Sequence, residues 1–240
     1  MELAARIRPP VFEIGLKGYC WGAEAVRLAV EADRLAEEFG VSIVYDPQSV
    51  DIPAVAAATN RILVFAQHMD PLPPGRGVGM VLAEAIRAAG AVGTLLNHSE
   101  KPLTLGELRR AIERARSTGL ATLVFADSLD EAAALARLGP DIVLAEPPDL
   151  IGGGLSVGNV MAGFVADTVA AVKGVDPRIL VMSGAGVSGP DDVEQMMRLG
   201  IDGTGSSSGI LKAADPVATM RAMLEATARA WQDLHPGWLP

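Results

Sequence analysis

Short apolar runs alternate with amphipathic stretches along most of the chain. Most of these runs carry apolar residues at successive positions, which is typical of strands buried on both faces of a parallel sheet. The pattern predicts eight strands. The runs are PVFEIGL from Pro10, VSIVYD from Val41, RILVFAQ from Arg61, AVGTLLN from Ala91, LATLVFAD from Leu120, DIVLAE from Asp141, RILVMSG from Arg178 and GIDGTG from Gly200.

Helical periodicity fills many of the segments between the runs. Two of these segments open with a capping box, in which a hydroxyl side chain and a glutamate three residues later cap each other's backbone N–H groups. The boxes are Thr104 with Glu107 and Ser128 with Glu131. In the first of these helices an apolar stripe is expected, made of Leu105, Leu108, Ile112 and Ala115.

Eight strands with helices between them predict an α/β fold, a closed (βα)8 barrel. An open doubly wound sheet is the alternative, and it favours a G-x-G-x-x-G turn after the first strand. The first strand is instead followed by GLKGYCWG, which lacks that spacing. No long polar linker divides the 240 residues, so we expect a single domain over residues 1–240.

Composition limits the partners of this chain. The formal net charge of -9 argues against nucleic acid and against an anionic membrane surface, because both attract basic patches. Cys20 is the one cysteine, which excludes an internal disulfide and favours a reducing cytoplasm. No apolar run reaches the roughly 18 residues that suggest a membrane helix, and no signal segment is expected.

Polar residues end most of the strand-like runs. In a (βα)8 barrel the active site lies at the C-terminal ends of the strands, so Lys17, His98 and Glu146 would share one rim. Taken singly, each has a plain structural explanation: a surface cation, a hydrogen-bonded histidine and a helix-capping acid. Their occurrence together favours catalysis. His68 and His235 lie outside this set and are expected to be structural.

Glycine-rich and serine-rich segments follow the last three strands. They read IGGGL, SGAGVSG and GTGSSSG. Barrels often bind phosphate with the loops after strands seven and eight, where glycine lets backbone N–H groups approach the oxygens closely. Tight turns would also explain these segments, but three in succession favour a phosphate site.

The sequences LKGY, LLNHSE and AEPPDLIGGG resemble the triosephosphate isomerase family, particularly its shorter archaeal form. Longer matches include VFAQHMDPLPPGRGVG, AGAVGTLLNHSE and GILKAADP, and they extend from about the first strand to the last helix. The resemblance implies a TIM barrel that isomerises small phosphorylated sugars. The expected pair is D-glyceraldehyde 3-phosphate and dihydroxyacetone phosphate, interconverted through an enediolate without a cofactor or metal, in glycolysis and gluconeogenesis.

Four catalytic roles are implied by this resemblance. Glu146 matches the general base, and His98 matches the electrophile that polarises the carbonyl. Lys17 matches the cation that stabilises the enediolate, and Glu100 matches the acid that orients it. A neutral histidine and a closing lid loop are well-known features of this family, and both are carried over here as expectations.

The resemblance also implies the phosphate contacts and the lid. The phosphate would meet Gly152, Gly186, Ser207 and Ser208. Pro147 and Pro148 would form the stiff end of a lid that excludes water, and the glycines from Gly152 would form its flexible end. This arrangement explains why a charged residue ends an apolar run and is followed by prolines and glycines.

Three positions depart from the family pattern. Gly15 stands where the family has Asn, Gly18 where Thr is frequent, and Val78 where Thr reaches a neighbouring subunit. We expect these changes to enlarge the pocket near the carbonyl end and to make it more apolar. Losing the polar partners together avoids leaving one of them buried and unpaired.

Two further hypotheses stay open because of these departures. One is isomerisation of a slightly larger phosphorylated ketose, such as a tetrulose phosphate. The other is a barrel that binds phosphate ligands with little or no catalysis. The resemblance and the long loop from His68 to Gly79 also imply a homodimer or homotetramer.

Overall fold

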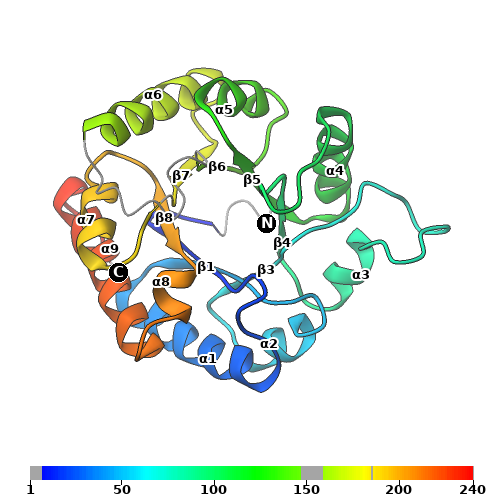
Figure 1. Cartoon of the computed structure of the whole chain (residues 1–240), viewed down its shortest axis with the longest axis horizontal. Helices are drawn as coiled ribbons and strands as arrows, with labels where there is room; N and C mark the ends of the chain where they lie inside the picture. The colour runs from blue at the N-terminus through cyan, green and yellow to red at the C-terminus, as the bar shows by residue number, and fades with distance from the viewer. Residues whose placement is uncertain (1–6, 147–158, 185, 240) are drawn as a thin grey trace.

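Eight parallel strands form a closed barrel in which each strand pairs with the next and β8 pairs with β1 (Figure 1). This computed structural model describes residues 7–146, 159–184 and 186–239. Every predicted strand is present there, so the predicted (βα)8 fold is confirmed. The strands are β1 Val11–Gly15, β2 Ser42–Asp46, β3 Leu63–Ala66, β4 Gly93–Leu96, β5 Ala121–Ala126, β6 Ile142–Ala145, β7 Leu180–Ser183 and β8 Gly203–Ser206.

Helices surround the barrel on its outside, as Figure 1 shows. In the described part of the chain they are α1 Gly22–Phe39, α2 Ile52–Ala58, α3 Ala83–Ala88, α4 Leu105–Thr118, α5 Leu129–Ala136, α6 Asn159–Val175, α7 Pro190–Met197, α8 Ser208–Leu211 and α9 Pro216–Leu234. None of these helices is both long enough and apolar enough to cross a bilayer.

The alternation of side chains along β1 separates two apolar layers. Phe12 and Ile14 belong to the large cluster between barrel and helices, whereas Val11 belongs to the smaller cluster inside the barrel. Because successive side chains of a strand point to opposite faces, Glu13 shares the inner face with Val11. Glu13 is therefore a buried acid on the inner face of the barrel, and its side chain is only 9% exposed.

Local signals predicted the helix starts well. Thr104 and Glu107 form the predicted capping box, and the Ser128 hydroxyl accepts a hydrogen bond from the N–H of Glu131. The predicted stripe on α4 is wrong at one position, because Leu105 is 62% exposed. Leu105 is the first residue of the helix, so periodicity in that turn does not decide what covers it.

Candidate active site

A cavity of about 1030 Å³ opens at the C-terminal ends of the strands. It is lined by all four residues with implied catalytic roles, which come from the segments directly after β1, β4 and β6. Three of the four implied phosphate contacts line it as well. These seven residues are Lys17, His98, Glu100, Glu146, Gly186, Ser207 and Ser208. The fourth phosphate contact, Gly152, lies outside the described residues.

Lys17 is held in an unusual backbone conformation directly after β1. Its φ of 46° lies in the left-handed region, which non-glycine residues adopt only when the surroundings enforce it. Side-chain amides of Gln48 and Gln67 donate hydrogen bonds to its carbonyl oxygen, at 2.6 and 3.0 Å. Two neighbouring strand ends therefore fix the direction in which the lysine leaves β1.

The Lys17 ammonium lies 2.7 Å from a carboxylate oxygen of Glu100. Burial alone would lower the pKa of Lys17, but the hydrogen bond and charge of Glu100 outweigh burial and raise it. The same hydrogen bond lowers the pKa of Glu100. The lysine thus stays positively charged in the cavity at neutral pH.

Asn97 positions the histidine that follows it at the end of β4. Its φ is 60°, and its amide nitrogen donates to the carbonyl oxygen of Phe125 at 3.1 Å. The ring of His98 then lies edge-on against the ring of Phe125, with centroids 4.6 Å apart. This positioning role of Asn97 was not predicted from the sequence.

The hydrogen bonds of His98 define its tautomer. The backbone N–H of Glu100 donates to Nδ1 of the imidazole at 3.0 Å. Since Nδ1 accepts, the ring proton of the neutral form lies on Nε2. Burial and the nearby Lys17 charge lower the pKa of His98, so the imidazole is a neutral hydrogen-bond donor.

Glu146 follows the last residue of β6 and reaches over the neighbouring strand. Its backbone N–H donates to the carbonyl oxygen of Ala126 at 2.9 Å, which extends the β5–β6 ladder. A Cβ placed on Gly184, after β7, would lie 3.9 Å from Oε1 of Glu146. Burial raises the pKa of Glu146, the Lys17 charge opposes this, and Asp127 and Glu100 add to it. The result is a carboxylate more basic than in water.

The loops after β7 and β8 pack tightly against each other. The Ser206 hydroxyl donates to the carbonyl oxygen of Val187 at 2.9 Å. A Cβ on Gly209 would lie only 2.6 Å from the Ser206 hydroxyl oxygen, so glycine is needed for this approach. The Ser207 hydroxyl donates to the Gly15 carbonyl at 2.5 Å and ties this corner to β1. Ser206 and Ser207 therefore join the loops after β7 and β8 to each other and to β1 at one corner of the cavity, which Gly186 and Ser208 also line.

Sequence reasoning missed a buried acid on the floor of the cavity. Glu13 and Asp46 line the cavity from β1 and β2, and their carboxyl groups face each other closely enough for one, if protonated, to donate to the other. Burial raises the pKa of Glu13 to about 7 and that of Asp46 well above its usual range. One signal was available: a glutamate two residues before Gly15 lies on the same inward face.

This acid overturns the expectation of a larger and more apolar pocket at Gly15. A Cβ on Gly15 would lie 2.5 Å from Oε1 of Glu13, so the carboxyl already fills the space that a side chain would take. At Gly18, by contrast, no described atom lies within 4 Å of an added Cβ. Val78 is fully exposed at the tip of its loop. The space beside Gly15 is thus occupied by a carboxyl group and is not an apolar enlargement of the pocket.

The two remaining histidines differ from each other. The predicted structural role of His235 fits its stacking on Trp231, with ring centroids 3.7 Å apart. His68 does not lie away from the site as expected, because it lines the same cavity. Its Nε2 is 3.2 Å from Oδ1 of Asp70. The other carboxylate oxygen of Asp70 accepts a hydrogen bond from the backbone N–H of Val81. His68 therefore helps to hold the segment after β3.

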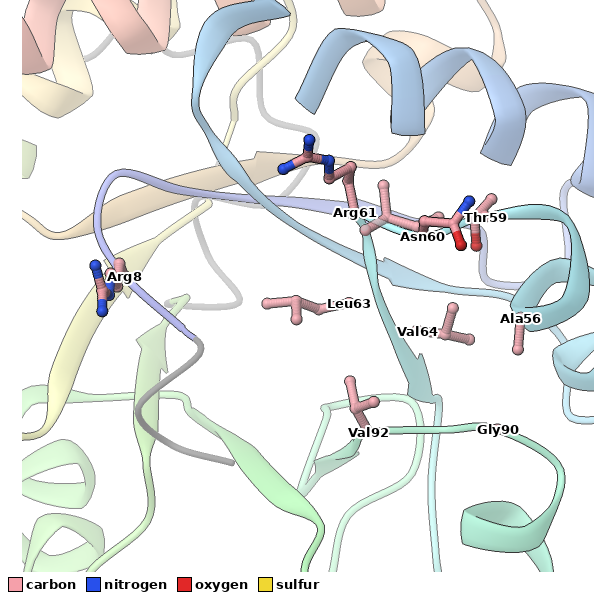
Figure 2. Close-up of a pocket in the computed structure, with 10 residues that line it drawn as sticks. Arg8, Ala56, Thr59, Asn60, Arg61, Leu63, Val64, Gly90 and Val92 are labelled. Carbon is pink, nitrogen blue, oxygen red and sulfur yellow. The ribbon is translucent and has the colours of Figure 1, made fainter. Parts of the chain in front are cut away.

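A second pocket, of about 490 Å³, lies where β3 begins, at the opposite mouth of the barrel (Figure 2). Arg8, Asn60 and Arg61 contribute polar groups to it, together with apolar residues of β3. None of the predicted site residues lines this pocket. Among the described residues, no group of three or more His, Cys, Asp or Glu side chains is arranged to hold a metal.

Comparison with known proteins points to one family. The model of the triosephosphate isomerase family matches residues 14–225. A protein named triosephosphate isomerase from Methanobacterium bryantii is 40% identical over 209 residues, which cover 86% of this chain and 92% of that protein. The protein of that name from Methanosarcina barkeri is 39% identical, over 90% of this chain and 97% of its own. The one from Methanocaldococcus jannaschii is 37% identical, over 85% and 93% respectively.

Proposed function

Because the chain belongs to the triosephosphate isomerase family, it is an isomerase, and we propose that Glu146, His98 and Lys17 carry out its reaction. The reaction interconverts D-glyceraldehyde 3-phosphate and dihydroxyacetone phosphate. The observation that carries the assignment of residues is that these three side chains line a single cavity at the C-terminal rim.

Glu146 moves the proton between the two carbons. Its carboxylate takes a proton from the carbon next to the carbonyl, and the electron pair of that C–H bond forms the double bond of the enediolate. The same proton-carrying carboxyl then returns a proton to the neighbouring carbon. Burial favours this step, because a carboxylate with a raised pKa is a stronger base.

His98 and Lys17 stabilise the charge that develops on oxygen. The neutral imidazole donates from Nε2 to the carbonyl oxygen and can exchange protons between the two oxygens of the enediolate. The Lys17 ammonium, oriented by Glu100, lies near the same negative charge. Groups held in place before the reaction stabilise such charge without reorganisation.

The phosphate of the substrate would lie at the corner made by the loops after β7 and β8. Gly186, Ser207 and Ser208 line the cavity there, and Lys17 adds a positive charge. Gly152 and the lid from Pro147 to Gly154 enter this proposal through the family resemblance, because they lie outside the described residues.

The segment between β3 and α3 supports assembly into a homodimer or homotetramer. In Figure 1 this segment extends away from the barrel. Val78 and Met80 on it are exposed apolar side chains, which a second copy of the chain would cover. Light scattering of the purified protein distinguishes these assemblies from a monomer.

Replacing Glu146 by Gln tests the catalytic assignment. Glutamine keeps the shape but cannot take a proton, so kcat for the triose phosphates should fall about 10³-fold or more. Binding of a phosphate-bearing enediolate analogue should persist, as measured by calorimetry. Unchanged kcat in E146Q would contradict the assignment.

A substrate panel on the wild type separates the remaining hypotheses. Preference for triose phosphates supports the proposal. Preference for tetrulose phosphates would reassign the substrate, and ligand binding without turnover would indicate a binding barrel.

A further inference from the structure

The acid pair on the cavity floor is not used by the mechanism above. We propose that Asp46 keeps its proton and uses it to donate a hydrogen bond to Glu13, and that Glu13, as a neutral acid, donates a hydrogen bond to an oxygen of the bound sugar phosphate. Glu13 is then a substrate-binding residue of this chain. The inference rests on the proposed function for the identity of the ligand.

Two glycines fix the position of the Glu13 carboxyl. Glu13 lies beside Gly205 of β8 in the strand register, and a Cβ there would be 2.5 Å from its Oε2. A Cβ on Gly15 would be equally close to its Oε1. Two glycines on adjacent strands thus make the space that Glu13 fills, and they confine its carboxyl to the inside of the barrel.

Asp46 is 1% exposed, and its Oδ2 receives no hydrogen bond from the N–H and O–H donors of the described residues. A buried carboxylate oxygen without a donor is costly, whereas the O–H of a neutral acid can donate to the facing carboxyl. Burial raises the pKa of both acids, and the Asp46 Oδ2 is the oxygen left without a donor. We therefore place the shared proton on Asp46.

Glu13 lines the cavity, so its own proton can form a hydrogen bond with a ligand bound there. With that proton, the carboxyl O–H is a donor to a carbonyl or enediolate oxygen. Without it, the carboxylate has only acceptors and repels an anionic ligand. The protonated form is therefore the form that binds substrate.

The charges around Glu13 come from three sides. Asp46 faces it from β2, the Lys17 ammonium from the segment after β1, and Glu146 from the end of β6. Gly205 on β8 brings no charge. Burial and Glu146 favour the neutral acid, whereas Lys17 and the Asp46 hydrogen bond favour the carboxylate. Lys17 keeps its charge and His98 stays neutral through this range, so neither produces a decline near pH 7, where Glu13 is expected to titrate. Ionisation of Glu146 supplies the base and raises the rate, so it does not produce a decline either.

The test is the pH profile of kcat/KM for dihydroxyacetone phosphate in wild type, E13Q, E13L and D46N. In the wild type, kcat/KM should fall as pH rises through about 7. In E13Q the amide donates at every pH, so this alkaline decline should disappear and the plateau should stay within about threefold of wild type. E13L has no donor and should lose about 10-fold to 100-fold at all pH values. Circular dichroism checks that each variant is folded.

D46N is the matched control for the position of the proton. An amide donates to Glu13 as a protonated Asp46 does, so the decline should stay within about half a pH unit of its wild-type position. A decline that persists in E13Q would overturn the proposal, and a D46N decline displaced by more than about one pH unit would overturn the assignment of the proton to Asp46. Absence of any isomerisation by the wild type would instead defeat the proposed function. An active wild type with a decline unchanged in E13Q defeats only this inference.

Discussion

Two glutamates face the same cavity from different depths of the barrel. Glu146 follows the last residue of β6 and is half-buried at the rim, whereas Glu13 lies within β1 and is 9% exposed. Glu13 needs glycine around it: Cβ atoms on Gly15 of its own strand and on Gly205 of β8 would each lie 2.5 Å from its carboxyl oxygens. A Cβ on Gly184 would lie 3.9 Å from Glu146, an ordinary contact. Identical side chains are therefore packed differently at the two levels.

The difference in depth gives the two acids opposite tasks. At the rim, Lys17 opposes the effect of burial on the pKa of Glu146, so the carboxylate remains available as a base. On the floor, a second acid faces Glu13, and burial raises its pKa to about 7. Pairs of acids whose pKa values are set apart by their surroundings are how one pocket holds a base and a neutral donor together.

The largest change in stability is expected for E13Q, which tests whether Glu13 differs from Glu146 in being held as a neutral acid. Because the folded-state pKa of Glu13 is raised from 4.5 to about 7, its contribution to stability is present below pH 4.5 and lost as pH rises through about 7. Glutamine removes this loss. Relative to wild type, E13Q should therefore gain about 3 kcal/mol of unfolding free energy between acidic and alkaline pH. Urea unfolding of both proteins across that range measures the difference, and parallel curves would show that Glu13 is not held neutral by the fold.

A smaller loss of stability is expected when Gly15, which lies next to the Glu13 carboxyl, is replaced. In G15A the new Cβ would lie 2.5 Å from Oε1 of Glu13, and the acid has little room to move. We expect a loss of about 1–2 kcal/mol, as for other overpacked sites. In an E13A background the same change should cost less, so a double-mutant cycle should give a coupling above roughly 0.5 kcal/mol. Additive effects would mean that Gly15 does not serve to seat Glu13.

The smallest effect is expected at Gly18, which serves as the control for G15A. Gly18 is exposed, and no described atom lies within 4 Å of an added Cβ. G18A should therefore change the unfolding free energy by less than about 0.5 kcal/mol. A larger loss there would indicate that glycine is needed along this segment for reasons other than the buried acid.

Much of this molecule could be predicted from local patterns. Apolar runs gave the strands, the capping boxes gave helix starts, and the strand ends gave Lys17, His98 and Glu146 as neighbours in space. These predictions succeed because the carboxyl ends of parallel strands in a barrel meet at one mouth. The roles of the rim residues came from the family resemblance and not from the pattern.

The floor of the cavity could not be predicted in the same way. Whether Glu13 enters the barrel depends on which face of β1 points inward, and its pairing with Asp46 depends on the register between β1 and β2. The sequence predicts lost bulk at Gly15, because it does not show which neighbouring side chain fills the space beside a glycine. In the structure the Glu13 carboxyl fills that space.

The most direct test of the central claim is an infrared titration of the two glutamates. Difference spectra of wild type against E13Q and against E146Q isolate the carboxyl bands of Glu13 and Glu146 as pH is raised. The account predicts that Glu13 keeps its neutral-acid band to about pH 7. It also predicts that Glu146, as the base, is a carboxylate at the pH of maximal activity. A Glu13 carboxylate throughout the range, or a neutral Glu146 in the active enzyme, would contradict it.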